Sequence, residues 1–288
     1  MLDLRLYAIV LRLSALRPGA VPADHGDQAR AALLNLIRSG DLPLSRRLHD
    51  ANTRKPYTVS LLNGGKRGRD GALHFGMGDS AEWRFTLLHE PAFEALLRRY
   101  IWNQTLPHVR IGAVEFQISN AFASGSHPDS GSITLAALHE RWNVAPETLP
   151  RSIVLDFLSP TAFNLGQDRA SGRYRIRSTP DARTLFSTLR KHWLKLGGVA
   201  PGDEFDTWVG ERVETRPLNP RAHTVFVERR PVESFSGRVS FTVHGSDVRW
   251  LPLLHLLADL AFWTGVGYQT SRGMGQVRRV QTEEPSYG

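Results

Sequence analysis

The sequence predicts an α+β protein made of two domains that share one order of elements. Strand-like and helix-like segments follow each other as β-α-β-β-α-β in the first half of the chain, and the same order returns in the second half. Between the halves, residues 143–152 (NVAPETLPRS) have the proline content of a linker. This order is the ferredoxin-like one, so we expect two tandem ferredoxin-like domains, over residues 1–145 and 150–288.

Each element of the first half has its own signal in the sequence. Strands are indicated by alternation and β-branched residues, and helices by apolar residues at a spacing of three and four. The expected order is a strand in 4–13, a helix in 26–40, strands in 55–63 and 82–88, a helix in 91–102 and a strand in 108–120. In the second helix, Phe93, Leu96, Leu97 and Tyr100 are expected to point inward. A short helix near Thr134–Trp142 leads into the linker.

The second half repeats the pattern with one additional strand. The expected order is a strand in 151–158, a helix in 181–198, strands near 207–215, 223–228 and 237–245, a helix in 251–263 and a strand in 275–280. This is one strand more than the ferredoxin-like order needs. The pairing of the strands in this half therefore stays open.

Composition restricts the class of protein. The chain has 288 residues, a formal net charge of +8 and no cysteine, which excludes disulfides, cysteine–zinc sites and thiol catalysis. Its most apolar window, residues 250–263, is interrupted by Pro252, His255 and Asp259, and this argues against a membrane span. We expect a cytoplasmic protein that does not enter a membrane. The surplus of positive charge favours a polyanionic partner such as a nucleic acid.

A glycine-rich loop, GVGYQTSRGMGQVRRV (265–280), lies near the end of the chain. A dinucleotide-binding loop follows a strand and opens a helix, whereas this loop follows a helix and precedes a strand. Glycines allow positive φ, and turns of this kind expose backbone N–H groups to anions. Two interpretations stay open from the loop alone: contact with an extended phosphate chain such as RNA, helped by Arg272, or a structural crossover.

Three stretches of the sequence resemble one known family. The segment 253–277 (LLHLLADLAFWTGVGYQTSRGMGQV) is similar to the C-terminal signature of CRISPR-associated endoribonucleases of the RAMP superfamily, which cut precursor CRISPR RNA within its repeats. VLDFLSPTAF (154–163), with the helix that follows, resembles the start of that family's second domain. LSRRLHDANTRKPYTVSLL (44–62) resembles the segment that usually carries its catalytic histidine.

The resemblance implies two ferredoxin-like domains and metal-independent cleavage of CRISPR repeat RNA, with no cofactor and no metal site. RNA can be cut without a metal because its own 2′-OH attacks the adjacent phosphate, which gives a 2′,3′-cyclic phosphate and a 5′-OH. The protein must then position the nucleotide, move protons and stabilise charge on the phosphorane. In this family homodimers are common, and association with a CRISPR effector complex is a further partnership that the resemblance implies.

His49 is the expected proton-transfer residue and Lys55 the cation that stabilises the phosphorane. Their spacing resembles that of the catalytic histidine and lysine in some members of the family. Other members add a tyrosine from the first helix, which residues 27–38 lack, and Tyr57 is the candidate substitute or RNA-positioning residue. His25 and His74 are the competing histidines of the same domain.

Two basic segments and the glycine-rich loop are the expected RNA contacts. Alternation places Arg173, Arg175 and Arg177 on one face of an extended segment; the alternative interpretation is a solvated edge strand. The turn NGGKRGRDG (63–71) is equally consistent with a solvated turn and with a nucleic-acid contact. The expected RNA-binding residues are Arg46, Arg47, Arg54, Arg169, Arg173, Arg175, Arg177, Gly265, Gly267, Arg272, Gly273 and Gly275.

Other functions receive less support from the sequence. No zincin, P-loop or G-x-S-x-G pattern is present. The main alternative is a non-catalytic RAMP subunit that binds guide RNA and scaffolds an effector complex, since such a subunit needs neither His49 nor Lys55. A DNA-binding protein is a third possibility, and it would show no dependence on a 2′-OH.

Overall fold

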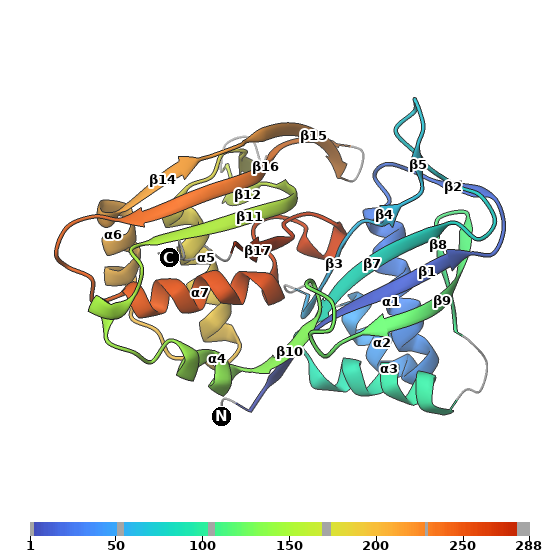
Figure 1. Ribbon diagram of the computed structural model, residues 1–288, viewed down its shortest axis with the longest axis horizontal. Coiled ribbons are helices and arrows are strands. Elements are labelled where there is room, and N and C mark those ends of the chain that lie inside the picture. Colours follow the sequence, from blue (N-terminus) through green and yellow to red (C-terminus); the bar gives the residue numbers. More distant parts are fainter. Residues whose placement is uncertain (1–2, 51–54, 103–106, 169–173, 228–229, 281–288) are drawn as a thin grey trace, which may run out of the picture. The chain divides into compact units, whose positions relative to one another are not determined.

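A computed structural model describes residues 3–50, 55–102, 107–168, 174–227 and 230–280, without the side chains of 99–102. The chain divides into two compact units (Figure 1). The N-terminal unit comprises Leu4–Thr134 together with Gln269–Gly273. The C-terminal unit is built around Leu135–Tyr268 and the strand that follows Met274. The middle of the glycine-rich loop thus belongs to the N-terminal unit, whereas the sequence-based division placed the whole loop in the second domain.

An antiparallel sheet forms the base of the N-terminal unit. Its strands run in the order β3 (Tyr57–Val59), β7 (Ser80–Leu87), β1 (Arg5–Ala15), β9 (Val114–Phe122) and β8 (His108–Ile111), with β4 (Asn63–Gly64) on β7 and β10 (Gly131–Thr134) on β1. Helix α1 (Gly26–Gly40) follows β1, and α3 (Glu90–Trp102) follows β7. Strands β1, β3, β7 and β9 supply the four strands of the ferredoxin-like order, which confirms the predicted fold class for this half.

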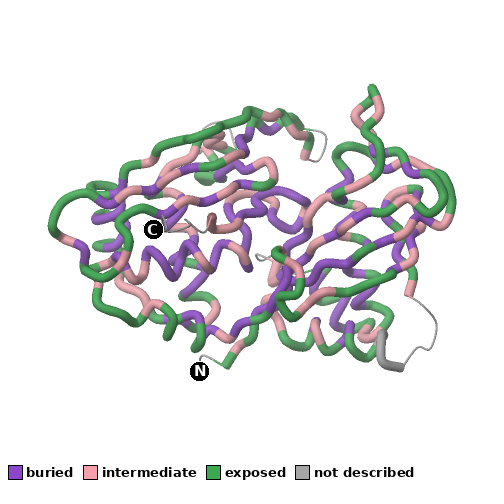
Figure 2. Tube along the Cα trace, viewed as in Figure 1, coloured by how far each residue is buried: buried purple, intermediate pink, exposed green. Residues whose placement is uncertain are grey.

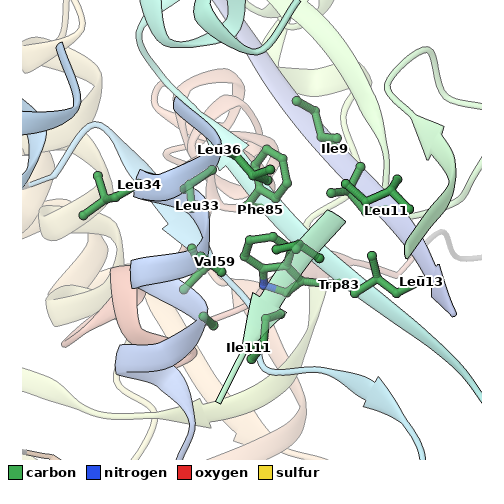
Figure 3. Packing of buried hydrophobic residues seen from close by; sticks show 14 of the residues in the cluster. Ile9, Leu11, Leu13, Leu33, Leu34, Leu36, Val59, Trp83, Phe85 and Ile111 are labelled. Carbon is green, nitrogen blue, oxygen red and sulfur yellow. The ribbon is translucent and has the colours of Figure 1, made fainter. Parts of the chain in front are cut away.

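The core of this unit lies between the sheet and its helices. Alternate residues of β1, among them Leu11 and Leu13, point to the same side as Trp83 and Phe85 of β7 (Figure 3). Helix α1 contributes Leu33 and further apolar residues at helical spacing to this cluster. Burial of each such large side chain contributes roughly 1.5–3 kcal/mol. This packing fixes the ends of β3 and α1, where the candidate site lies.

A second, smaller sheet extends from the N-terminal unit. It pairs β2 (Gly19–Val21) with β6 (Leu73–Phe75), and β6 with β5 (Lys66–Arg67). The predicted strand 108–120 is two strands, β8 and β9, because the chain turns at Gly112 with a φ of +61°. Leu97, which was expected to point inward, is 40% exposed.

The C-terminal unit repeats the ferredoxin-like order. Its sheet runs β14 (Val213–Pro217), β16 (Arg230–Val243), β11 (Ser152–Thr161) and β17 (Val277–Arg279), with helices α5 (Ala182–Lys195) and α7 (Leu251–Thr264) after β11 and β16. The additional strand of the sequence prediction is β15 (Arg221–Val227). It forms a hairpin with the first half of β16, while β14 pairs with the second half. The tandem ferredoxin-like fold is therefore confirmed in both halves.

Further elements of this unit lie outside the four-stranded order. They are α4 (Leu135–Arg141), the 3-10 turn η1 (Pro146–Thr148), the hairpin of β12 (Phe163–Gln167) and β13 (Tyr174–Arg177), and α6 (Asp203–Arg212). The strand predicted near 207–215 was wrong over residues 207–212, which are the end of α6. Phe205, Trp208 and Val209 are buried there at helical spacing.

Helix α7 is buried along nearly its whole length (Figure 2) and holds an internal polar network. His255 is 0% exposed, its Nε2 lies 2.8 Å from the Pro150 carbonyl and its Nδ1 lies 2.5 Å from Nη2 of Arg279. Asp259, one turn further along the helix, accepts hydrogen bonds from Arg279 and from the indole N–H of Trp142. Burial, and then the charge of Arg279, lower the pKa of His255 to about 4.

None of the helices in the described residues, α7 included, is long and apolar enough to cross a membrane.

This network predicts an acid-dependent loss of stability. The folded-state pKa of His255, about 4, lies below the ordinary value of 6.5, so the folded protein binds fewer protons at this group than the unfolded chain. Stability is complete above pH 6.5 and is lost as the pH falls toward 4, by about 3 kcal/mol for this group. Chemical denaturation between pH 7 and pH 4 should show a smaller loss for His255→Gln. The control His244→Gln alters an exposed histidine and should behave like the wild type.

Candidate functional site

A short helix that the sequence analysis did not predict positions His49. Helix α2 (Leu42–Asp50) begins after Asp41, whose carboxylate accepts a hydrogen bond from the Leu44 N–H at 2.8 Å. Leu44 and Leu48, four residues apart, are buried, and the hydroxyl of Ser45 donates to the Leu34 carbonyl of α1 at 2.8 Å. These contacts attach one face of α2 to α1. His49 lies in the last turn, with its side chain 67% exposed.

Lys55 holds the end of α2. Its ammonium donates hydrogen bonds to the carbonyls of Leu48 at 3.0 Å and of His49 at 2.8 Å. Carbonyls in the last turn of a helix have no intrahelical partner and carry partial negative charge, so a cation is favourable there. The structure thereby links the segment before β3 to the turn that carries His49.

Arg30, from α1, joins these elements. Its Nη2 donates to the His49 carbonyl at 3.4 Å and its Nε donates to the hydroxyl of Tyr57 at 3.2 Å. Tyr57 is 1% exposed and its pKa is raised by burial, which favours the neutral phenol. His49, Lys55 and Tyr57 are therefore brought together around Arg30, a residue that the sequence analysis did not select. A direct role for Tyr57 in proton transfer stays a prediction.

Arg272 belongs to the same group of charges. It lies in the 3-10 turn η2 (Thr270–Arg272), and its Nε forms an ion pair of 2.9 Å with Asp27 in the first turn of α1. Gly26 permits this approach, because a Cβ there would lie 2.0 Å from the carbonyl oxygen of Arg272. Desolvation, then Arg30, lower the pKa of Lys55; Asp50 opposes the shift, and Arg272 contributes to it. Lys55 is thus a half-buried cation that lies near two other cations, Arg30 and Arg272.

His49 carries its own orienting contact. Its Nδ1 lies 2.9 Å from the carboxylate of Asp50. When Nδ1 donates to this carboxylate, the proton occupies Nδ1 and Nε2 is left as an acceptor. An exposed pair of this kind adds little to stability, but it fixes which ring nitrogen can take a proton. The group can therefore accept a proton at Nε2 next to cations that attract an anion.

The two competing histidines have ordinary structural settings. His25 is buried; the Leu62 N–H donates to its Nε2 at 2.8 Å, so its Nδ1 carries the proton that is donated to the Pro22 carbonyl at 2.6 Å. Burial lowers the pKa of His25. His74 is exposed and lies 3.5 Å from Asp70. Neither belongs to the group formed by Arg30, His49, Lys55, Tyr57 and Arg272.

The expected RNA-binding arginines have different surroundings. Arg46 and Arg47 lie exposed on α2, and Arg175 is exposed on β13, where it donates to the Leu165 carbonyl. Arg177 forms an ion pair of 2.6 Å with Asp181, so its charge is already partnered. Arg54, Arg169 and Arg173 lie outside the described residues.

The glycine-rich loop makes close contacts within each unit. A Cβ on Gly267 would lie 2.2 Å from the Ala162 carbonyl, and one on Gly273 would lie 2.5 Å from Leu61. Gly265 ends α7, and the N–H of Gly275 donates to the Pro160 carbonyl at 3.0 Å. These contacts support the structural interpretation of the loop. Contact of the same glycines with RNA stays a prediction.

No three histidine, aspartate or glutamate side chains gather in a metal-binding arrangement among the residues described in the structure.

The sequence analysis missed helix α2 and Arg30. The sequence does contain two signals for α2, a capping residue and apolar residues at helical spacing. Asp41, Pro43, Leu44 and Leu48 carry the capping and spacing signals of α2. Arg30 had no such signal, because its role depends on the distance between α1 and the start of β3.

Comparison with known proteins agrees with this fold. The model of the family described as CRISPR-associated endoribonuclease Cas6 matches residues 155–277. The product complex of the Thermus thermophilus Cas6 protein TTHB231 is 23% identical, with a TM-score of 0.71 over 96% of this chain and 100% of that chain. The product complex of the Cas6 protein TTHA0078 is 25% identical, with a TM-score of 0.69 over 96% and 100%.

A third structure, of the same TTHA0078 protein, carries a histidine-to-alanine substitution; it is 24% identical, with a TM-score of 0.66 over 96% and 99% of the two chains. None of the curated proteins matches the sequence. Over residues 155–277 the family match agrees with the resemblance to CRISPR-associated endoribonucleases, and the structural matches show that the fold is shared over nearly the whole chain.

The contacts of His25 predict that it stabilises the fold. In His25→Leu, the Leu62 N–H and the Pro22 carbonyl lose their partner, at a cost of about 1–3 kcal/mol for each group that stays buried. The matched variant His74→Leu changes an exposed side chain and should stay within about 0.5 kcal/mol of the wild type. Urea unfolding measures both. Equal stabilities for the two variants would contradict a structural role for His25.

Proposed function

We propose that the protein is a metal-independent endoribonuclease that binds and cuts CRISPR repeat RNA to generate guide RNAs. One observation carries the proposal: His49 is exposed at the end of α2, and that end is fixed by Lys55 and Arg30. An exposed proton acceptor beside cations is the arrangement that cleavage of an RNA phosphate requires. The family match over residues 155–277 adds support.

In the proposed step, the 2′ oxygen of the nucleotide before the cut attacks its own phosphorus. The 2′-OH proton passes to a base, the bond between phosphorus and the 5′ oxygen breaks, and the leaving 5′ oxygen takes a proton. The products are a 2′,3′-cyclic phosphate and a 5′-OH. His49 accepts the first proton at Nε2 or, when protonated, supplies the second; Asp50 orients the ring for either task.

Lys55 and its neighbouring cations would stabilise the charge that develops on the phosphorane. The pKa of Lys55 is lowered, chiefly by desolvation, and nearby Arg30 and Arg272 disfavour its charged form further. A phosphate bound beside these groups relieves that repulsion. Asp27 partners Arg272 and leaves Arg30 and Lys55 directed at the turn that carries His49. A second copy of the chain and a CRISPR effector complex are further partners that we propose on the resemblance alone.

The histidine assignment is tested with repeat RNA under single-turnover conditions. Relative to the wild type, His49→Ala should slow cutting by about 10²–10⁴-fold, because it removes general acid or base catalysis. Its affinity for the RNA should change little, since the side chain is exposed. The control His74→Ala should cut at the wild-type rate. RNA with a 2′-deoxy residue before the cut should be bound and left intact.

Wild-type cutting by His49→Ala would refute the assignment of this residue. Tight binding of repeat RNA without any cut by the wild type would instead favour the scaffold alternative. Cutting of the 2′-deoxy substrate would refute the proposed attack by the 2′ oxygen.

The role of Lys55 is tested separately. Lys55→Met should lower the single-turnover rate at saturating RNA by about 10²–10³-fold, the effect of removing one group that stabilises transition-state charge. The matched control Lys191→Met removes an exposed lysine from α5 and should leave the rate unchanged. Loss of affinity with an unchanged rate at saturation would show that Lys55 only binds RNA.

A further inference from the structure

A projection of the N-terminal unit that we call the basic finger, residues 63–74, has no role in the site described above. It comprises β4, β5, the turn 68–72 and the start of β6, and it extends away from the main sheet (Figure 1). Most of its residues are exposed or half-buried (Figure 2). It carries three cations, Lys66, Arg67 and Arg69, against one carboxylate, Asp70.

The base of the finger is anchored in the core. β5 pairs with β6, in the register Lys66 to His74 and Arg67 to Leu73, and β6 pairs with β2. Phe75, at the end of β6, is 3% exposed and its ring meets Phe116 edge-on at 5.1 Å between centroids. The finger is therefore a fixed extension of the unit at its base.

The turn at the tip is held by its own hydrogen bonds. The Gly68 N–H donates to the Ala72 carbonyl at 2.8 Å, and the Gly71 N–H donates to the Gly68 carbonyl at 3.0 Å. The carboxylate of Asp70 accepts the Ala72 N–H at 3.1 Å and lies 3.5 Å from His74. The Ala72 hydrogen bond is the largest cause that lowers the pKa of Asp70. The only acid of the finger is thus used inside the turn.

The cations of the finger remain available. Lys66, Arg67 and Arg69 are exposed, and among the described residues no carboxylate forms an ion pair with any of them. Arg67 gives one donor to the Gly71 carbonyl at 3.3 Å, which fixes its side chain within the turn. A projection that is anchored at its base and presents three cations, none of them paired with a described carboxylate, complements a chain of phosphates.

The sheet register gives the distance from the finger to the candidate site. Tyr57 lies opposite Leu87 on β7, and Gly64, at the base of the finger, lies opposite Ala81 on the same strand. Six residues of strand span about 20 Å. A nucleotide at His49 and Lys55 is therefore separated from the finger by a stretch of several nucleotides.

We propose that the basic finger binds the phosphate backbone of the same RNA, several nucleotides away from the cut. This inference rests on the proposed function and adds a second contact that holds the RNA in register. Because the contact is electrostatic and distant, it contributes to affinity and leaves the chemical step unchanged.

The test compares wild type with a finger variant, Lys66→Gln, Arg67→Gln and Arg69→Gln combined. A matched variant, Arg183→Gln, Lys191→Gln and Lys195→Gln combined, removes three exposed cations from α5 and has the same net charge. Affinity for uncut repeat RNA, made non-cleavable by a 2′-deoxy residue, is measured between 50 mM and 300 mM salt. The finger variant should bind about tenfold or more weakly at 150 mM, and its slope of log affinity against log salt should fall by about 2.

The α5 variant should keep nearly the wild-type affinity and slope, and the finger variant should keep the wild-type cutting rate at saturating RNA. RNAs shortened from either end locate the contact: one truncation should abolish the difference between wild type and finger variant. Equal affinities and slopes for the two variants would overturn the inference, and so would a difference that persists with every truncation. Failure of the wild type to cut would count against the proposed function alone. The comparison of RNA affinities would still test whether the finger binds RNA.

Discussion

The contact of the Lys55 ammonium with the last carbonyls of α2 is the constraint on which the candidate site depends. Without a partner, those carbonyls would have to be solvated at a helix end that lies against α1. Lys55 satisfies them from the start of β3, which is paired to the central sheet. His49 is thus positioned by the core of the unit, although its own side chain is exposed and is hydrogen-bonded to the neighbouring carboxylate of Asp50.

The charged groups around this contact favour the binding of an anion. Arg30 and Arg272 contribute to lowering the pKa of Lys55, after desolvation as the main cause, and Asp27 partners Arg272. Like charges in a half-buried setting are costly unless something of opposite sign is bound. The carbonyls of α2 offset part of that cost, and a phosphate would offset the rest. The same cations that hold the helix end would then also hold the substrate.

The sequence predicted the architecture because periodicity is a local property. The alternation of β1 and the helical spacing of α1 and α5 identified those elements, and their order led to the tandem fold. The sequence prediction failed where residue type and spacing indicate different elements. Phe205, Trp208 and Val209 suit a strand by residue type, yet they are buried along a helix. The extra strand β15 was placed only by the structure, since its hairpin with β16 is a pairing that a sequence alone does not state.

For the candidate site, His49 and Lys55 were predicted from a resemblance to a known family. The residues that hold them in place were not predicted. Arg30 and Asp27 lie on α1 and meet their partners across 19 and 245 residues of sequence, respectively, so no local pattern identifies them.

The most direct measurement is incubation of the wild-type protein with its repeat RNA in excess EDTA, followed by mapping of the ends of the RNA fragments. A single cut that leaves a 2′,3′-cyclic phosphate and a 5′-OH is the predicted result. A 3′-OH and 5′-phosphate, or a reaction abolished by EDTA, would contradict the account.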